Sequence, residues 1–447
     1  MQIEKSMKSE KKTEMKKERK NRRRMQKLEE EKGITLLALI ITVVIMLILA
    51  AVTISVTLGE GGLVDQAKWA AEQTANLTKS EQEQLDELQK EFTNLMAEDS
   101  EITPPNPGPE LPEGWDGDKV KPEESTDGKT VPVPIGYTAS SASGENSVND
   151  GFVIYEGTEE VNDSNVSTAK TSRNQFVWIP VEDISQIANQ TSGTDGNNRQ
   201  NYQGKLYDFS TSGVTEMSSY GQGTTTYREP DIVTDFDGSS TNLSILGLSS
   251  SSEFKTQLQE EYNEMIESVD RYGGFYIGRY ETGNLAANTS TEPVVVKGNN
   301  SIGGVNWYYQ YQNSKLIGAN KNVVSTMIWG SMFDRVLIWL TETGDKTYSD
   351  LMNSSSWGNY SDSTGAAETN SGDRQPTGTN EAWQSNNIYD LAGNVSDWTI
   401  EASYTYARVL RGGRFDYAGS SNPASSRGHC ESDAYGGYGS RSALYIK

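Results

Sequence analysis

The 447-residue chain has only one cysteine and one histidine, the neighbours Cys430 and His429. An internal disulfide needs two cysteines, and zinc sites built from four cysteines, or from two cysteines and two histidines, need more ligands than this chain has. Any catalytic pair of a histidine with a serine or cysteine nucleophile would have to use His429. These shortages exclude disulfide frameworks and the usual zinc sites before any motif is considered.

Positive charge is scarce outside the N-terminus. Residues 1–33 carry 13 Lys and Arg against 7 Asp and Glu, whereas the rest of the chain carries 26 basic and 55 acidic residues. The formal net charge of −23 therefore combines a basic tail with a strongly acidic body. Because an acidic surface repels phosphates, we expect no nucleic-acid partner.

Charged residues are absent between Gly33 and Gly59, and this stretch is apolar on every side. About 20 apolar residues in a helix cross the hydrocarbon core of a bilayer, so residues 34–58 are predicted to form a transmembrane helix. The basic residues before it place the N-terminus in the cytoplasm and the remaining chain outside the cell. We therefore expect a single-pass protein of the cell membrane.

The N-terminus resembles a class III prepilin leader, which is basic and ends here in Lys-Gly, followed by a hydrophobic helix that begins Ile-Thr-Leu-Leu. The resemblance implies that a prepilin peptidase cuts between Gly33 and Ile34. Two positions depart from the family pattern, which has Phe where this chain has Ile34 and Glu where it has Ala38. In the family that Glu is associated with fibre assembly. An uncleaved signal anchor is the alternative interpretation.

Two segments of different composition connect the membrane helix to the C-terminal part. In residues 59–98 apolar residues recur mostly every three or four positions among Glu, Gln and Lys, which predicts a helical stalk. Residues 99–136 contain 8 of the 13 prolines and scattered aliphatic residues, which predicts an extended spacer. The predicted organisation is a leader at 1–33, a membrane helix at 34–58, a stalk at 59–98, a spacer at 99–136 and a folded domain at 137–447.

The C-terminal domain holds all 22 tyrosines and seven of the nine tryptophans. Apolar residues from Phe254 to Val269 recur at helical spacing, and a pair of glycines at 273 and 274 is predicted to end this helix. A second helix is predicted to be capped by Ser325 and to run to Leu340. Aromatic density predicts strands at 176–180 and 274–280, and polar tracts at 189–225 and 341–387 are expected to be loops. An α+β fold follows.

Several pieces of this domain resemble the sulfatase-modifying-factor, or formylglycine-generating-enzyme, family and occur in that family's order. The pieces are Phe176-Val-Trp-Ile-Pro, Phe275-Tyr-Ile-Gly-Arg-Tyr-Glu, Leu337-Ile-Trp-Leu, Asp390-Leu-Ala-Gly-Asn-Val-Ser-Asp-Trp, Arg408-Val-Leu-Arg-Gly-Gly and Gly439-Ser-Arg. Together they cover most of residues 150–447. The resemblance implies a C-type-lectin-like fold for the domain.

The metal ligands of the catalytic members of that family are missing. Those members use two nearby cysteines upstream of an arginine to bind copper, but residues 417–427 contain no cysteine and Cys430 follows Arg427. A related iron-dependent branch uses several histidines, and this chain has only His429. We therefore predict that the protein is not an enzyme, with an oxidase of the formylglycine-generating type as the alternative.

The resemblance also implies a calcium ion bound by Asp390, Gly393, Val395 and Asp397. Calcium prefers several oxygen ligands, and two carboxylates that bracket a glycine turn can converge on one cation. The alternative is a turn with two solvated aspartates. We expect Ca²⁺ to bind here as a structural ion.

Residues 411–447 alternate framework-like residues with Tyr, Phe, Asp, Ser and Gly. In C-type-lectin-like proteins diversified by retroelements, such a C-terminal stretch forms the ligand-binding face, and the resemblance implies the same here. Tyr and Phe supply rigid contact area, while small polar residues adapt their hydrogen bonds. The predicted recognition residues are Arg414, Phe415, Tyr417, His429, Tyr435 and Tyr438.

The function that we expect from this domain order is non-catalytic. A surface-displayed, adhesin-like protein would bind an extracellular protein or glycan through its C-terminal face and be held at the membrane by residues 34–58. A minor pilin subunit is a further alternative, because the N-terminus resembles a prepilin.

Overall fold

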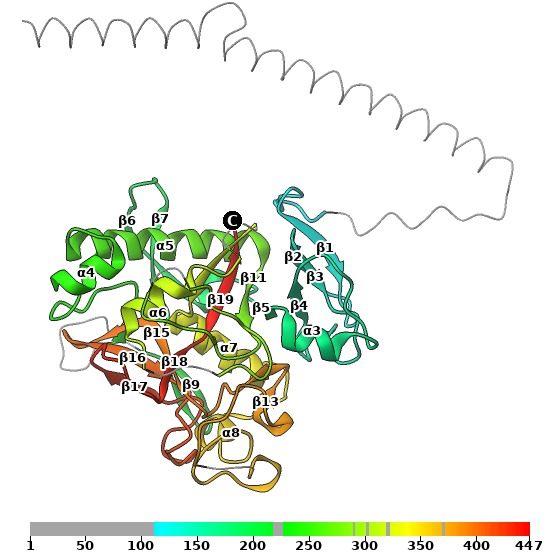
Figure 1. Ribbon diagram of the computed structural model, residues 1–447. Coiled ribbons are helices and arrows are strands. Elements are labelled where there is room, and N and C mark those ends of the chain that lie inside the picture. Colours follow the sequence, from blue (N-terminus) through cyan, green and yellow to red (C-terminus); the bar gives the residue numbers. More distant parts are fainter. Residues whose placement is uncertain (1–110, 218–226, 289–290, 301–303, 319–321, 369–371) are drawn as a thin grey trace, which may run out of the picture. The chain divides into compact units, whose positions relative to one another are not determined.

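The computed structural model describes residues 111–447 except 218–226, 289–290, 301–303, 319–321 and 369–371 (Figure 1). The predicted leader with its cleavage site at Gly33 and Ile34, the membrane helix at 34–58 and the stalk at 59–98 lie outside the described residues. Within the described ranges, no helix combines the length and the apolar character that crossing a bilayer requires.

The largest sheet of the described chain has six strands in the order β12-β19-β11-β5-β4-β3. Its strands are β3 (Tyr137–Ala139), β4 (Val153–Glu156), β5 (Gln175–Pro180), β11 (Gly274–Gly278), β12 (Val323–Met327) and β19 (Ser442–Ile446). All neighbouring strands in it are antiparallel. Because the C-terminal strand β19 pairs with both β11 and β12, it is an interior strand of this sheet (Figure 1).

A second sheet is formed mainly by the C-terminal part of the chain and carries two of the six predicted recognition residues, His429 and Tyr438. Its main path is β10-β15-β16-β17, and β18 pairs in parallel with the start of β15. These strands are β10 (Tyr227–Arg228), β15 (Ser396–Ser403), β16 (Ala407–Arg411), β17 (Arg427–Cys430) and β18 (Tyr438–Ser440). Every residue of β15 and β16 is buried, so this sheet forms a rigid support.

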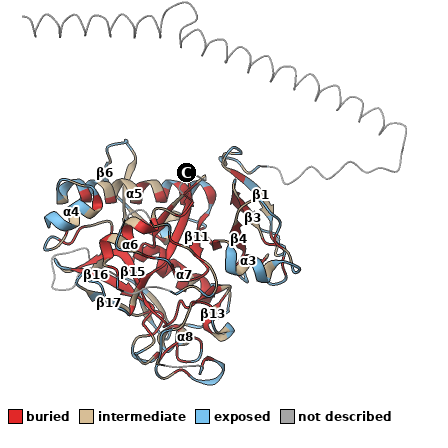
Figure 2. Ribbon diagram, in the orientation of Figure 1, coloured by how far each residue is buried: buried red, intermediate tan, exposed pale blue. Residues whose placement is uncertain are grey.

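Two longer helices contribute much of the core, which is shown by burial in Figure 2. Helix α5 (Ser251–Tyr272) and helix α7 (Gly330–Glu342) bury their apolar residues in the same hydrophobic cluster. The shorter helices are α3 (Val166–Ser172), α4 (Ser240–Leu246), α6 (Trp307–Ser314) and α8 (Tyr348–Met352). Helices and mainly antiparallel sheets together make an α+β fold, as the sequence predicts.

The helix predicted around Phe254 and Val269 is confirmed as α5, and both side chains have no exposed surface. The Ser250 side chain accepts a hydrogen bond from the backbone N–H of Glu253 at the start of the helix. Gly273 ends it in the left-handed conformation, with φ of 78°. The two predicted strands are also confirmed as β5 and β11, which are neighbours in the central sheet.

The prediction that Ser325 caps the second helix is wrong. Ser325 lies in strand β12, and helix α7 begins five residues later, with Trp329 at the N-cap position. Trp329 has no side-chain oxygen, and the first N–H groups of the helix, those of Gly330 and Ser331, donate instead to the carboxylate of Glu229. A residue far away in the sequence therefore replaces the local cap.

The prediction of an extended spacer is wrong for its described C-terminal part. Strands β1 (Val120–Glu124) and β2 (Thr130–Pro134) form an antiparallel hairpin. The side chains of Val131 and Val133 are fully buried in the cluster that contains Phe176 of the central sheet. Alternating valines thus attach this segment to the domain despite its prolines.

The long polar tracts contain more regular structure than we predict from composition. The tract at 189–225 forms two hairpins in its described part, made of β6 (Ala188–Thr194) with β7 (Gln200–Gly204), and β8 (Tyr207–Ser210) with β9 (Gly213–Glu216). Their strands are largely exposed or half-buried, which explains why the sequence lacks a hydrophobic pattern. The tract at 341–387 is mostly irregular, apart from α8, short 3₁₀ turns and the strand β13 (Gln384–Ser385), which pairs with β14 (Ile388–Tyr389).

Adjacent glycines at the junction of α5 and β11 give a matched test of packing. A Cβ atom on Gly274 would lie 2.3 Å from the carbonyl oxygen of Ile179 and 2.6 Å from the Trp178 ring, whereas one on Gly273 would contact nothing within 4 Å. We expect Gly274→Ala to destabilise the protein by about 3 kcal/mol through overpacking. Gly273→Ala should cost only about 1 kcal/mol for its left-handed backbone. Denaturant unfolding measures both, and equal costs would contradict the prediction.

Candidate ligand-binding face

Two buried arginines hold the ends of the loop that carries the first predicted recognition residues. Arg411 ends β16 and Arg427 begins β17, and both donate to the carboxylate of Asp334 on helix α7, with N–O distances of 2.6 and 2.5 Å. Arg427 also pairs with the buried Glu401 of β15 at 2.9 Å. Residues 412–426 are therefore anchored at both ends to the core.

Arg414, in this loop, is the centre of a tyrosine cluster. Its guanidinium carbon lies 4.1 Å from the ring centre of Tyr417, 4.8 Å from that of Tyr435 and 5.4 Å from that of Tyr438. The rings of Tyr435 and Tyr438 are also in contact, with centres 4.8 Å apart. Cation–π and ring contacts of this kind order the side chains.

The tyrosine cluster presents rings to solvent and keeps its cation inside. Tyr417 and Tyr435 are 39% and 46% exposed, whereas Arg414 is 7% exposed and pairs with Asp416. Tyr438 is half-buried, and burial followed by the influence of the Cys430 thiol raises its pKa to about 12, so it stays neutral at physiological pH. The accessible surface is therefore aromatic and hydroxylated.

The structure brings together four of the six predicted recognition residues and separates the other two from them. Phe415 is half-buried, its backbone N–H donates to the carbonyl of Asn394, and its ring is not among those around Arg414. His429 is exposed on β17, and its imidazole packs against the ring of Tyr404 at 4.7 Å instead. Tyr404 belongs to a second aromatic group that the sequence analysis missed, although the Tyr-Thr-Tyr pattern at a strand end could have indicated it.

Three of the predicted calcium residues, Asp390, Gly393 and Val395, lie in the turn between β14 and β15, and Asp397 is the second residue of β15. Gly393 has φ of 77°, and a Cβ atom there would lie 2.2 Å from the carbonyl oxygen of Asn359. Asp390 and Asp397 are both 1% exposed. One carboxylate oxygen of each has hydrogen-bond partners, whereas the other, Oδ1, is buried without one among the described residues.

The electrostatics of this aspartate pair fit a bound cation. Burial raises the pKa of Asp390 to about 6, and the repulsion of Asp397 adds to the effect. Burial likewise raises the pKa of Asp397, while Arg441 opposes the increase. Two unpartnered carboxylate oxygens beside a glycine turn are suitable ligands for Ca²⁺, together with the backbone oxygens expected from Gly393 and Val395.

The predicted site needs only two acidic side chains. No group of three or more His, Cys, Asp or Glu side chains suited to a metal is found in the part of the chain that the structure describes. Glu281 is a further buried acidic residue near this turn. Its carboxylate accepts hydrogen bonds from the backbone N–H of Val395 and from the side-chain amide of Asn394. Glu281 thus positions the turn.

The chain matches no model of a known protein family and no curated protein sequence. Among solved structures it is similar to PvdO from Pseudomonas aeruginosa, at 14% identity over 39% of this chain and 82% of that one, with a TM-score of 0.27. It is also similar to variable protein 1 of Treponema denticola, at 14% identity over 61% of this chain and 95% of that one, with a TM-score of 0.22. At these TM-scores neither likeness supports an argument about function.

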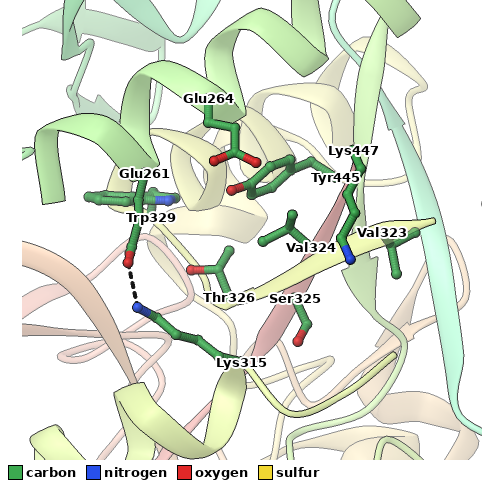
Figure 3. A pocket seen from close by; sticks show the side chains of 10 residues that line it. All are labelled: Glu261, Glu264, Lys315, Val323, Val324, Ser325, Thr326, Trp329, Tyr445 and Lys447. Atoms are coloured by element: carbon green, nitrogen blue, oxygen red, sulfur yellow. Dashed lines mark hydrogen bonds and ion pairs between the residues drawn. The ribbon is translucent and has the colours of Figure 1, made fainter. Parts of the chain in front are cut away.

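A cavity of about 310 Å³ lies beside β12 and β19 (Figure 3). Val324 and Tyr445 form part of its wall, and the ion pair between Lys315 and Glu261 lies along one side. None of the six predicted recognition residues lines it.

A buried pair of glutamates supports the sheet beneath the face. Glu229 is fully buried and accepts the N–H groups of Gly330 and Ser331 at 2.6 and 2.8 Å. Glu401 approaches the same place, since a Cβ atom on Gly330 would lie 2.3 Å from its Oε2 and 3.1 Å from Oε2 of Glu229. Burial, and next the repulsion of Glu401, raises the pKa of Glu229 to about 8 from its ordinary 4.5.

The raised pKa of Glu229 predicts that stability falls as the pH rises from about 5 to 8. In this range the folded protein binds a proton that the unfolded chain has lost, so each increase in pH favours unfolding. For this group the loss is on the order of a few kcal/mol. Glu229→Gln should remove much of the slope in melting temperature, whereas Glu182→Gln, at an exposed glutamate, should leave it unchanged. Equal slopes in all three proteins would contradict the prediction.

Proposed function

We propose that the protein is a non-catalytic, surface-displayed binding protein whose C-terminal face captures an extracellular protein or glycan. The observation that carries this proposal is the cluster around Arg414. Exposed rings of Tyr417 and Tyr435 are held in place by an internal cation, on a loop fixed by Arg411 and Arg427. Rigid aromatic side chains with hydroxyl groups provide large contact areas at a small entropic cost.

The chemistry available at this face favours binding over catalysis. The segment from Tyr417 to Arg427 has no cysteine, so a copper ion could not be held there by two thiolates. Cys430 is a free, half-buried thiol whose sulfur contacts the hydroxyl of Tyr438 at 3.8 Å. The only histidine, His429, packs against Tyr404. The chain therefore lacks the ligands for a copper ion held by two thiolates and for an iron ion held by several histidines.

The finer details of the proposal come from the sequence. Residues 137–447, together with the hairpin at 120–134, would form a C-type-lectin-like domain of the formylglycine-generating-enzyme type. Residues 34–58 would anchor this domain at the cell membrane after processing by a prepilin peptidase. The C-terminal face would be diversified by a retroelement, and a neighbouring near-copy of the codons for 411–447 that differs only at adenines would support this part.

The proposal includes a structural Ca²⁺ ion at Asp390, Gly393, Val395 and Asp397. Such an ion would satisfy the two Oδ1 atoms that otherwise have no partner among the described residues. It would also neutralise the repulsion between the two carboxylates and so stabilise the turn that precedes β15. The ion would have no catalytic role.

Calcium should raise the melting temperature of the purified protein by a few degrees at millimolar concentration, because it binds the folded state selectively. Asp390→Asn should abolish this increase. Without calcium, the same variant should be at least as stable as the native chain, because it lacks the repulsion from Asp397. Asp208→Asn, at an exposed aspartate, is the matched control and should keep the response. An unchanged response in Asp390→Asn would show that calcium binds elsewhere.

The double variant Tyr417→Ala, Tyr435→Ala should lose binding to extracellular targets by at least about tenfold, because central aromatic residues dominate binding energies. Cells that display the full chain can be tested on arrays of extracellular proteins and glycans. Tyr309→Ala, at a half-buried tyrosine of helix α6, is the control and should bind as the native chain does. Turnover of a cysteine-containing, sulfatase-type peptide by the purified protein would contradict the non-catalytic function directly.

A further inference from the structure

The turn between β15 and β16 presents a second, separate aromatic surface. Three residues, Tyr404, Thr405 and Tyr406, connect the two strands, and the rings of the tyrosines stack with centres 5.3 Å apart and planes 17° apart. Tyr406 is 39% exposed and Tyr404 is half-buried. Tyr404 has φ of 51°, a left-handed conformation that costs a residue with a side chain about 1–2 kcal/mol.

Two rings from other strands extend this surface. The exposed imidazole of His429 packs edge-on against Tyr404 at 4.7 Å, and Tyr227 lies next to His429 at 6.5 Å. The hydroxyl of Tyr227 donates to the carbonyl of Arg427, which fixes the ring on the sheet. His429 thus packs against Tyr404, and Tyr404 stacks on Tyr406, so the positions of both tyrosine rings are defined.

An exposed carboxylate lies at the tip of the turn. Asp235 accepts a hydrogen bond from the hydroxyl of Thr405 at 3.3 Å, and its backbone N–H donates to the carbonyl of Thr405 at 2.9 Å. Asp235 is therefore fixed beside the residue that separates the two stacked tyrosines. The chain after residue 33 is strongly acidic, with 55 acidic and 26 basic residues, so its wider field also attracts cations.

The two turn tyrosines, Tyr404 and Tyr406, differ from the other aromatic residues of these strands and loops in one respect. Tyr417, Tyr435 and Tyr438 already surround Arg414, and Arg427 lies 5.3 Å from the ring centre of Tyr227. In the described chain, no lysine or arginine lies over the ring of Tyr404 or Tyr406. Other tyrosines of this protein therefore pack against a guanidinium, whereas no guanidinium of the described chain contacts the rings of Tyr404 and Tyr406.

We infer that Tyr404, Tyr406 and Asp235 form a binding site for an arginine side chain of a partner protein. A planar guanidinium stacks on the exposed Tyr406 face while the carboxylate of Asp235 accepts its hydrogen bonds. The negative charge of Asp235 favours a basic polypeptide over a neutral ligand. The site lies outside residues 411–447 except for its contact with His429, and it does not depend on the function proposed for the Arg414 cluster.

Binding of a fluorescent peptide of alternating glycine and arginine to the full-length protein tests this inference, with a glycine–glutamine peptide as the neutral probe. We expect saturable binding of the arginine peptide only. Tyr406→Leu, which keeps apolar area but removes the π face, should weaken it roughly threefold to tenfold. Tyr406→Phe should retain it. Asp235→Asn should weaken binding and reduce its dependence on salt, because one charge contact is lost.

The controls separate this site from the proposed binding face. Tyr417→Ala should leave binding of the arginine peptide unchanged, whether or not the Arg414 cluster captures its own partner. Unchanged melting temperatures in the Tyr406 variants would show that the exposed side chain is not needed for folding. The inference is overturned by equal binding of the two peptides, by native affinity in Tyr406→Leu, or by no binding of the arginine peptide at millimolar concentration.

Discussion

The candidate binding face depends on the ion pairs that the buried carboxylate of Asp334 makes with two arginines. It accepts hydrogen bonds from both Arg411 and Arg427, which stand at the two ends of the loop that holds Arg414 and Tyr417. Removing one partner of a buried ion pair leaves an uncompensated charge and costs about 3–5 kcal/mol. The loop ends are therefore constrained by the core, while exposed residues between them can change without breaking that constraint. The exposed side chains can therefore differ while the loop keeps its position.

Local patterns in the sequence predicted the elements that local forces determine. The apolar period and the terminal glycines predicted helix α5, and the structure contains both. Helix α7 has no local cap of this kind, because its N–H groups bond to Glu229, about a hundred residues earlier. The hairpin at 120–134 was missed for a similar reason, since its valines are buried only by a distant sheet. Partners distant in sequence are invisible to a periodicity argument.

The same distinction explains the candidate site. Residue types in the C-terminal segment predicted aromatic recognition residues, but not which of them share a surface. Arg414 and Tyr417 are close in sequence, whereas Tyr435 and Tyr438 reach them because β18 pairs in parallel with the start of β15. The register of β16 and β17 opposes His429 to Val409, and its imidazole contacts Tyr404 at the β15–β16 turn. Strand register therefore decided the membership of each cluster.

The arginines of the C-terminal segment are all used internally, and this determines the character of the surface. Arg411 and Arg427 pair with Asp334, Arg414 with Asp416, and Arg441 with Asp397. Positive charge in this segment thus stabilises the frame and orders the tyrosines, and little of it reaches solvent. What solvent meets is aromatic rings, hydroxyls and the exposed carboxylates of Asp416, Glu431 and Asp433. A partner that binds here would be recognised through ring contacts and hydrogen bonds, with basic groups favoured by the surrounding field.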